Sequence, residues 1–361
     1  LMNRYEEALL MKRTNAEEFD IIDGAVPPQY PAEPNRKRII ILGALIGLIL
    51  GVGGAFLIEY MDDSVKRVED VEKYLDLPLV GSVPKVQPVK VPSSSVQEYS
   101  SKVVVGSGRV KKRKLSSKHI KSLEELMGRL VTTIGSKSAV AESYRSLWTN
   151  IQFANVDKPV KTILITSPAP KEGKSLTAIN LALTIARSGM KVLLMDTDLH
   201  RPRVHWISDR QKSPGLSELM AGDLNDIDGY LRNTTMDNFY VLTSGALTPN
   251  PAEILGSEKM KRLIEEVKKR FDIVLFDSPP VIPVADAAIL AGMLDTTLLV
   301  VRSGKTTKQA VSRAKEVLQR LNASIYGVVL NNVDYTKQYG YYRYYYYNYY
   351  HYYTSEKDEI S

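Results

Sequence analysis

The chain has 361 residues, enough for one or two domains with additional segments, and its apolar and charged fractions are ordinary for a globular protein. It contains no cysteine, which excludes a disulfide framework and thiolate chemistry. The formal net charge of +7 is mild but unevenly distributed along the chain.

The first part of the chain contains a candidate membrane span. Residues 1–18 have a helical pattern, and the prolines of the following segment predict an extended entry to residues 39–58. That stretch is twenty residues without a charged or polar side chain, and a helix of this length rises ~30 Å, about the thickness of the bilayer core. A buried core helix is the alternative. Lys and Arg are balanced on the two sides, so their distribution leaves the orientation open.

A juxtamembrane segment and a linker follow the span. Residues 59–83 predict a short helix that ends before Pro78, and residues 84–136, rich in Ser, Val, Pro and Lys, predict a flexible linker. Within the linker, residues 99–123 carry eight Lys or Arg and no acidic residue. Such a segment attracts polyanions such as anionic lipid headgroups or nucleic acid, although a solvated linker has the same composition.

A nucleotide site is indicated after residue 140, where strand and helix patterns alternate. The apolar strand 160–167 leads into the loop PAPKEGKS and then into a helical stretch, which is the context of a phosphate-binding P-loop. Backbone N–H groups of the loop would surround the phosphates, Lys174 would reach the β and γ oxygens, and Ser175 would ligate Mg²⁺. Pro168 stands where the strict pattern has glycine.

Acidic residues end two further apolar strands. Asp196 and Asp198 follow the strand that begins at Lys191, and Asp277 ends the strand FDIVLFD. Since functional groups gather at the carboxyl ends of parallel strands, these acids are candidates for binding Mg²⁺ and a nucleophile; a helix-capping pair is the alternative for the first two. Two more strand patterns, 296–304 and 324–334, complete five strands interleaved with helices, which predicts an α/β, doubly wound, mostly parallel sheet of the P-loop NTPase type.

Together these stretches resemble a known family. SPAPKEGKS, VLLMDTDLHRP and IVLFDSPP are similar to the Walker A, Walker A′ and Walker B motifs of bacterial tyrosine kinases, and AESYRSLWTNIQF, GLSELMAG, NPAEILGS and VADAAILA resemble further family segments. The proline-rich run, the span and DLPLVGSVP resemble the end of the chain-length-determinant (polysaccharide co-polymerase) module that carries such kinases. The tail YGYYRYYYYNYYHYY resembles the family's C-terminal autophosphorylation cluster.

The resemblance implies roles for individual residues, with ATP and Mg²⁺ as cofactors. It places Lys174, Asp196 and Asp198 in catalysis and Ser175, Asp196 and Asp277 at Mg²⁺. Glu142 and Arg145 would take part in oligomerisation. The implied ATP-binding residues are Ala169, Pro170, Lys171, Glu172, Gly173, Lys174, Ser175 and Leu176. The implied phosphoacceptors are Tyr339, Tyr341, Tyr342, Tyr344, Tyr345, Tyr346, Tyr347, Tyr349, Tyr350, Tyr352 and Tyr353.

The resemblance also implies a location and an organisation of the chain. A kinase domain needs cytoplasmic ATP, so the chain would lie in the bacterial plasma membrane with residues 1–38 outside, and an upstream part with a first span is expected. The implied segments are 1–38 (extracytoplasmic), 39–58 (transmembrane helix), 59–83 (juxtamembrane), 84–136 (basic linker), 137–334 (kinase domain) and 335–361 (tyrosine cluster).

The implied function is that of an ATP-dependent tyrosine autokinase that regulates the polymerisation and export of exopolysaccharide or capsule. The implied partners are copies of the chain in a ring, the polysaccharide polymerase and export machinery, and a tyrosine phosphatase. Anionic lipid would be a further partner through residues 99–123, and no nucleic acid is expected.

Two positions depart from the family's pattern. Lys171 replaces a glycine of the loop, and if that position needs a positive φ, lysine costs about 1 kcal/mol there. Trp148 replaces the last arginine of the family's oligomerisation pattern E-x-x-R-x-x-R. Its ion pair is therefore lost, and the ring contact through this helix is expected to be weaker or repacked.

Three other functions fit parts of the sequence. A membrane-tethered partitioning ATPase has a similar P-loop but no use for eleven clustered phenols. A non-catalytic co-polymerase subunit would bind nucleotide only, and Lys171 keeps that alternative open. The tyrosine tail could also be a stacking surface for nucleic acid or sugar.

Overall fold

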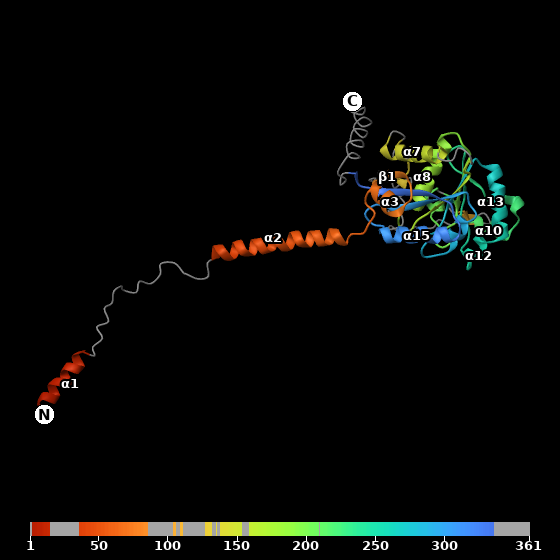
Figure 1. Cartoon of the computed structure of the whole chain (residues 1–361). Coiled ribbons are helices and arrows are strands. Elements are labelled where there is room, and N and C mark those ends of the chain that lie inside the picture. Colours follow the sequence, from red (N-terminus) through yellow and green to blue (C-terminus); the bar gives the residue numbers. More distant parts are fainter. Residues whose placement is uncertain are drawn as a thin grey trace, which may run out of the picture. The chain divides into compact units, whose positions relative to one another are not determined.

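The computed structural model describes residues 2–14, 36–85, 104–105, 109–110, 127–131, 135, 138–153, 159–208 and 210–335 (Figure 1). The chain forms two compact units, Leu1–Asp62 and Asp63–Ser361. The first unit contains two helices, and the second contains an α/β domain.

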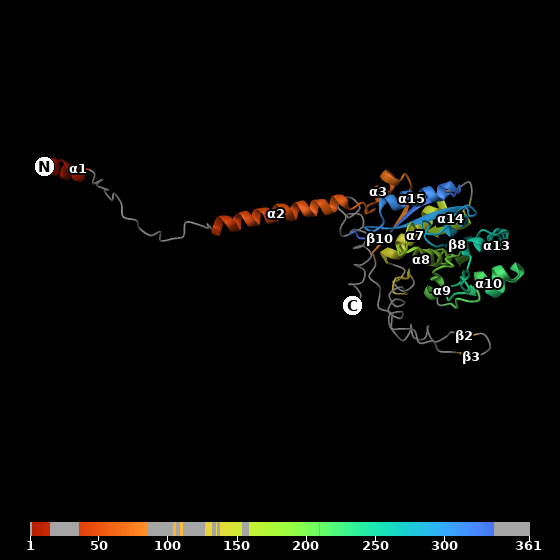
Figure 2. The ribbon, with the colours of Figure 1, turned by 90° about the horizontal axis from the view of Figure 1, so that it is seen from below.

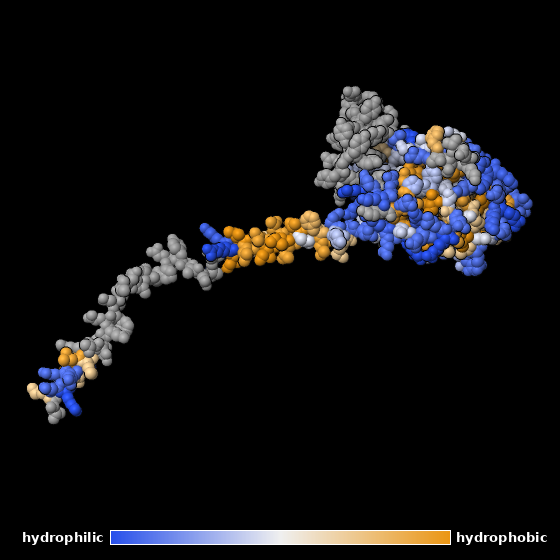
Figure 3. Space-filling model, viewed as in Figure 1, coloured by the Kyte–Doolittle hydropathy of each residue, from blue (hydrophilic) through white to orange (hydrophobic). Residues whose placement is uncertain are grey.

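The first unit contains α1 (Met2–Thr14) and α2 (Arg36–Met61), where helices were expected. The most apolar 18-residue window of α2 has a mean hydropathy of 2.6, and none of it is buried. Its apolar side chains form a continuous band after a charged first turn (Figure 3). The alternative of a buried core helix is therefore wrong. Among the described residues, α2 is the one helix long and apolar enough to cross a membrane.

The second unit is built around a sheet whose described strands number eight, in the spatial order β1-β10-β9-β4-β8-β5-β7-β6 (Figures 1 and 2). All neighbouring strands are parallel except β6 and β7. The five strands predicted from the sequence are β4, β5, β8, β9 and β10, so the predicted mostly parallel α/β sheet is confirmed. The strands are β1 (Leu79–Pro84), β4 (Thr162–Thr166), β5 (Val192–Asp196), β6 (Arg232–Asn233), β7 (Phe239–Leu242), β8 (Ile273–Asp277), β9 (Thr296–Arg302) and β10 (Ile325–Val333).

Helices cover both faces of this sheet (Figure 2). One face carries α7 (Ala139–Phe153), α8 (Lys174–Arg187) and α9 (Val204–Ile207). The other carries α3 (Val68–Leu75), α10 (Leu216–Ala221), η1 (Leu224–Asp226), α11 (Ile227–Tyr230), α12 (Pro251–Leu255), α13 (Glu258–Arg270), α14 (Asp286–Ala291) and α15 (Lys308–Arg320).

The central strands are buried on both faces, and this explains why the sequence shows them as nearly uninterrupted apolar runs. Every residue of β4, β5 and β8 is buried. Successive residues enter opposite cores: Ile163 and Ile165 of β4 belong to the core under α7 and α8, and Leu164 belongs to the core under α13 to α15. The buried strands therefore hold their polar carboxyl ends at one common edge.

Strand β1 was not predicted, because Leu79–Pro84 contains glycine, serine and proline instead of a β-branched run. It pairs in parallel with β10, and α3 precedes it as the short helix expected before Pro78. Gly327 of β10 allows the backbone at Pro78, just before β1, to lie close to β10, since a Cβ at position 327 would lie 2.3 Å from the carbonyl oxygen of Pro78. Through β1, the segment that follows α2 in the chain is part of the domain.

The predicted linker, 84–136, contains some described structure. The two-residue strands β2 (Val104–Val105) and β3 (Arg109–Val110) pair antiparallel. Near its end, Leu130 and Val131 are buried, and the Val131 N–H donates to Asn180 Oδ1 at 3.0 Å. The last part of the linker therefore packs on the domain, against helix α8.

We predict that Gly327→Ala destabilises the protein by about 1–3 kcal/mol more than Gly189→Ala, because it adds a steric clash to backbone strain. Both glycines have positive φ, 154° and 90°, but a Cβ at Gly189 meets no heavy atom within 4 Å. Gly189→Ala is thus the control for strain alone, about 1 kcal/mol. Denaturant unfolding of both variants measures the difference, and equal destabilisation would contradict this account of the β1–β10 contact.

Candidate nucleotide-binding and catalytic site

The loop between β4 and α8 has the backbone shape of a phosphate-binding loop. Gly173 has φ 99°, a backbone conformation that residues other than glycine rarely adopt, and a Cβ there would also displace the side-chain amide of Asn331. Lys171 also has a positive φ, 68°. Position 171 therefore has the positive φ that the sequence analysis considered, and lysine there costs about 1 kcal/mol in backbone strain relative to glycine.

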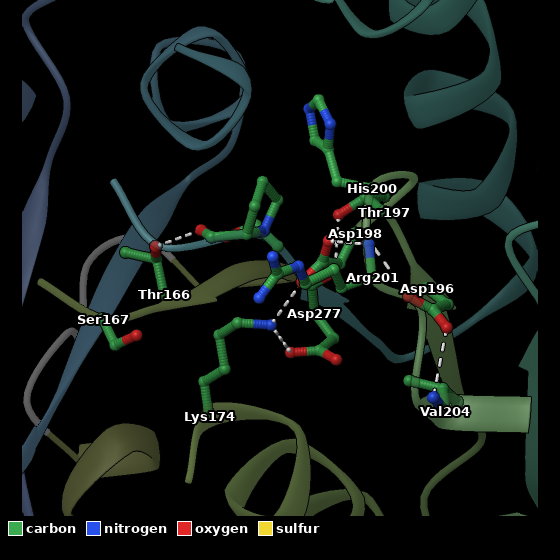
Figure 4. A network of polar contacts seen from close by, with 12 residues as sticks. Thr166, Ser167, Lys174, Asp196, Thr197, Asp198, His200, Arg201, Val204 and Asp277 are labelled. Atoms are coloured by element: carbon green, nitrogen blue, oxygen red, sulfur yellow. Dashed lines mark hydrogen bonds and ion pairs between the residues drawn. The ribbon is translucent and has the colours of Figure 1, made fainter. Parts of the chain in front are cut away.

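Lys174 lies at the centre of the site (Figure 4). It is the first residue of α8, and its Nζ is 2.8 Å from Asp198 Oδ2 and 3.6 Å from Asp277 Oδ1. Burial by itself lowers the pKa of Lys174, but the fields of Asp277 and Asp198 outweigh it and raise that pKa. Lys174 is thus a firmly protonated ammonium held between two carboxylates.

The three aspartates predicted as functional lie together at the carboxyl ends of β5 and β8. Asp196 and Asp277 are paired in register on these neighbouring strands, and both are fully buried. Asp196 accepts hydrogen bonds from the N–H groups of Val204 (3.1 Å) and Asp198 (3.3 Å). Asp198 Oδ1 accepts the N–H of Arg201 at 2.9 Å, so Asp198 is fixed by a backbone contact as well as by Lys174. Asp196 and Asp198 therefore also accept backbone N–H groups, as the alternative of a helix-capping or turn pair predicted.

Burial sets the protonation chemistry of this group. Burial raises the pKa of Asp196 well above its ordinary value, and the neighbouring carboxylate of Asp277 raises it further. Burial likewise raises the pKa of Asp277, and the ammonium of Lys174 opposes that rise. A single ammonium faces three carboxyl groups, so the site favours additional positive charge.

Asp277 has the environment expected of a group that binds Mg²⁺. Both of its carboxylate oxygens are buried without a hydrogen bond of ordinary length. The Lys174 ammonium lies 3.6 Å from Oδ1, and the Ser175 hydroxyl is close enough to lower the pKa of this carboxyl, so the carboxylate is only partly compensated. Ser175, in the first turn of α8, offers a hydroxyl. No group of three or more His, Cys, Asp or Glu among the described side chains could hold a metal. Ser175, Asp277 and Asp196 therefore fit an ion that takes other ligands from phosphates and water.

The side chain of Glu172 points back into the domain. The residue is 3% exposed, and its carboxylate accepts hydrogen bonds from Thr306 Oγ1 at 2.6 Å and from the Ala169 N–H at 3.3 Å. Burial raises its pKa to about 7, and these hydrogen bonds and the charge of Lys305 lower it by less. Because its side chain is engaged within the domain, Glu172 would contribute its backbone N–H and not its carboxylate to a nucleotide.

Sequence reasoning missed the residues that support the loop from β9, β10 and the turn after β9. Arg302 Nη1 donates to the carbonyl of Lys171 at 3.2 Å, and Asn331 Nδ2 donates to the carbonyl of Glu172 at 2.8 Å. Thr306 holds the Glu172 carboxylate. One signal was available: Asn331 and Asn332 are polar residues near the carboxyl end of an apolar strand, where functional groups gather.

Helix α7 carries the predicted oligomerisation residues. Glu142 and Arg145 pair with each other along the helix, with Arg145 Nε 2.6 Å from Glu142 Oε2, and Arg145 is exposed. Trp148 is 5% exposed and belongs to the core between α7, α8 and the sheet. An indole at this position therefore packs inward, and the role of α7 between copies stays a prediction.

The predicted phosphoacceptors, Tyr339 to Tyr353, lie outside the described residues, as does most of the basic segment 99–123. The last described residue is Tyr335, whose hydroxyl lies 2.7 Å from Ser82 Oγ of β1. Tyr335, which precedes the tyrosine cluster in the chain, is therefore hydrogen-bonded to the edge strand β1.

Comparisons with known sequences agree with the geometry. The profile of the family described as "AAA domain" matches residues 160–327. Tyrosine-protein kinase YwqD of Bacillus subtilis (strain 168) is 42% identical over 208 residues, which are 57% of this chain and 87% of that protein. Tyrosine-protein kinase etk of Escherichia coli (strain K12) is 30% identical over 333 residues, 92% of this chain and 43% of that protein. The chain thus spans less than half the length of the latter relative.

Solved structures give the same result. The kinase domain of Escherichia coli tyrosine kinase ETK superposes with a TM-score of 0.61 at 26% identity, covering 77% of this chain and 97% of that one. The chimerical protein CapA2B2 superposes with a TM-score of 0.60 at 30% identity, covering 74% of this chain and 99% of that one. The fold of the second unit is therefore shared with these proteins.

We predict that Glu172→Gln removes a pH-dependent loss of stability. The pKa of Glu172 is about 7 in the folded chain, against a usual value of 4.5, so the folded state binds more protons between these pH values. Stability from this group is fully present below pH 4.5 and is lost as pH rises to about 7, by at most about 3 kcal/mol. Unfolding of the full chain in detergent from pH 5 to 8 should show a shallower decline for Glu172→Gln. Parallel curves for the two proteins would contradict the burial effect.

Proposed function

Because the chain belongs to the bacterial tyrosine-protein kinase family, we propose that it transfers the γ-phosphoryl group of ATP to tyrosine hydroxyls, chiefly those of the C-terminal cluster of a neighbouring copy. The observation that carries the proposal is the position of Lys174, in a P-loop and within 3.6 Å of Asp198 and Asp277. Phosphoryl transfer to a hydroxyl needs a cation for the phosphates and a carboxylate for the proton.

The first step is an exchange of partners at Lys174. The ammonium of Lys174 donates to Asp198 Oδ2, and ATP would draw it to the β and γ oxygens. The carboxylate of Asp198 is then released, and it can orient the incoming phenol or assist at the metal. When bound, Mg²⁺ would neutralise charge on the phosphates, with Ser175, Asp196 and Asp277 as the residues that hold it.

Asp196 accepts the proton in this mechanism. The phenol O–H bond breaks as the bond from oxygen to the γ-phosphorus forms, the proton passes to Asp196, and the bond to the bridging oxygen breaks to leave ADP. A phenol has a pKa of ~10 and an ordinary aspartate about 4, so removal of the proton before the new bond forms is unfavourable. Transfer late in a loose transition state therefore suits this carboxylate better than prior removal of the proton.

Phosphorylation in trans would convert the tail into a switch. Eleven tyrosines lie between Tyr339 and Tyr353, and each phosphate adds about −1.5 to −2 charges at neutral pH. Phosphates on one tail repel one another and would remove it from the neighbour's site, which opens a ring of copies. We propose that this opening regulates polysaccharide polymerisation and export, and that a tyrosine phosphatase reverses it.

We propose that this activity lies at the bacterial plasma membrane, and the long apolar helix α2 supports this location. The need for ATP assigns residues 59–361 to the cytoplasmic side and residues 1–38 to the outside. The basic segment 99–123 would then lie where anionic lipid is available. The export machinery is the proposed partner on the membrane.

A complementation experiment tests transfer in trans. A chain truncated after Tyr335 keeps the site and lacks the phosphoacceptors, and full-length Lys174→Met keeps the phosphoacceptors and lacks the ammonium. Each protein alone, in detergent with Mg-ATP, should give no tail phosphotyrosine, and their mixture should phosphorylate the Lys174→Met tail. Adding Asp196→Asn to the truncated chain should lower the rate by roughly 10²–10⁴ through loss of the proton acceptor.

The remaining outcomes separate the alternatives. Phosphotyrosine on Lys174→Met alone would point to a contaminating kinase. No phosphotyrosine on the unaltered full chain, with nucleotide still bound, would favour the non-catalytic subunit. Release of phosphate without phosphotyrosine would favour a partitioning-type ATPase.

A further inference from the structure

Thr306, in the turn after β9, contacts both the nucleotide loop and the membrane-proximal segment. Its Oγ1 donates to Glu172 Oε1 at 2.6 Å and accepts the N–H of Arg302 at 3.0 Å. Its carbonyl oxygen accepts the N–H of Val65 at 2.8 Å. The side chain is 4% exposed, so water does not replace these contacts readily.

The membrane-proximal segment, residues 63–66, is bound to this turn along its whole length. The carbonyl of Val65 accepts the N–H of Gly304 at 2.9 Å, and the carbonyl of Asp63 accepts the N–H of Lys308 at 2.9 Å. Ser303 Oγ donates to the carbonyl of residue 66 at 3.1 Å, and the side chain of Val65 is fully buried. In sequence, residue 63 follows the end of α2 at Met61 by two positions.

On the nucleotide side, the same elements hold the strained part of the loop. Lys171, at φ 68°, has its carbonyl held by Arg302, and Glu172 has its carbonyl held by Asn331. The Glu172 carboxylate closes the loop on itself by accepting the N–H of Ala169 while Thr306 holds its other oxygen. Lysine at position 171 does not favour this backbone conformation by itself, so the surrounding contacts are needed to hold the loop in it.

We propose that Glu172 and Thr306 are positioning residues for the nucleotide: they form a latch that holds residues 169–173 in the phosphate-binding shape, and Thr306 couples this loop to the segment 63–66. The inference rests on the nucleotide-binding part of the proposed function, and it does not require phosphoryl transfer. A displacement of residues 63–66 would change the conformation of the nucleotide loop through two hydrogen bonds of Thr306. One joins its carbonyl to the Val65 N–H, and the other joins its hydroxyl to the Glu172 carboxylate.

The charges around the latch are consistent with this role. The charge of Lys305, next to Thr306, acts on the Glu172 carboxylate, and Arg302 and Lys171 are charged residues at the loop contact. The segment 63–66 contributes Asp63 and Lys66. A buried carboxylate that accepts two hydrogen bonds strengthens them when it is ionised. Ionisation of Glu172 therefore strengthens these two hydrogen bonds, although the cost of burying the charge lowers the stability of the whole domain.

A matched pair of variants tests the latch. Thr306→Val keeps the shape but removes the hydroxyl, and Thr306→Ser keeps the hydroxyl. In nucleotide-free full chain, Thr306→Val should speed hydrogen exchange of the amides in 169–173 and weaken binding of a fluorescent ADP by roughly tenfold, since it leaves buried partners unpaired. Thr306→Ser should stay within about twofold of the parent. Wild-type exchange and affinity in Thr306→Val would overturn the proposal.

Val65→Ala tests the coupling to the membrane-proximal segment. It removes a buried side chain from residues 63–66, away from the nucleotide loop, and should weaken ADP binding severalfold in the parent chain. In the Thr306→Val background, Val65→Ala should weaken ADP binding little further, because the hydrogen bond from Thr306 to Glu172 is already lost. Equal effects in both backgrounds, or no effect in either, would show that the segment does not act through Thr306. The two quantities measured are nucleotide binding and amide exchange, so the coupling can be tested even in a chain without kinase activity.

Discussion

The ammonium of Lys174 lies 2.8 Å from Asp198 and 3.6 Å from Asp277, where the ends of β5 and β8 bring three carboxyl groups out of water. Burying charges is expensive, and these carboxyl groups are tolerated because a cation lies among them. The raised pKa values of Asp196 and Asp277 show that this compensation is incomplete. In the mechanism that we propose, a nucleotide that draws the lysine toward its phosphates leaves the aspartates ready for a metal ion and a proton.

The fold keeps this arrangement in place from two directions. The parallel strands are buried on both faces, which aligns their carboxyl ends within one register of the sheet. The loop that carries Lys174 is held by neighbours far away in sequence, namely Arg302, Thr306 and Asn331. Those contacts offset the strain of Lys171 at positive φ and join the phosphate site to the segment that follows α2 in the chain.

Local patterns were sufficient to predict much of this. Buried strands appear as apolar runs, so β4, β5, β8, β9 and β10 and the edge where Lys174, Asp196 and Asp277 meet could be predicted from residue order alone. The apolar helix α2 and the short helix α3 also follow from local patterns. The possible strain at Lys171 could be anticipated because glycine is the residue that tolerates positive φ.

Other features depend on contacts between distant segments, which local patterns do not reveal. Strand β1 has little strand character of its own and gains its pairing from β10, which comes much later in the chain. Thr306 looks like an ordinary residue at the start of a helix, yet its hydroxyl holds Glu172. Trp148 occupies a position where the family's pattern has a charged residue, and only the packing of α7 on the domain shows that its side chain is buried.

The most direct test of the central claim is an experimental structure of the full chain bound to Mg²⁺ and a non-hydrolysable ATP analogue. The account predicts that Lys174 Nζ leaves Asp198 and lies within hydrogen-bonding distance of the β and γ oxygens. It also predicts that Asp277, whose oxygens are buried without a hydrogen bond of ordinary length, lies in the coordination sphere of the metal directly or through water. A complex in which Lys174 stays paired with Asp198 while the phosphates are bound elsewhere would contradict it.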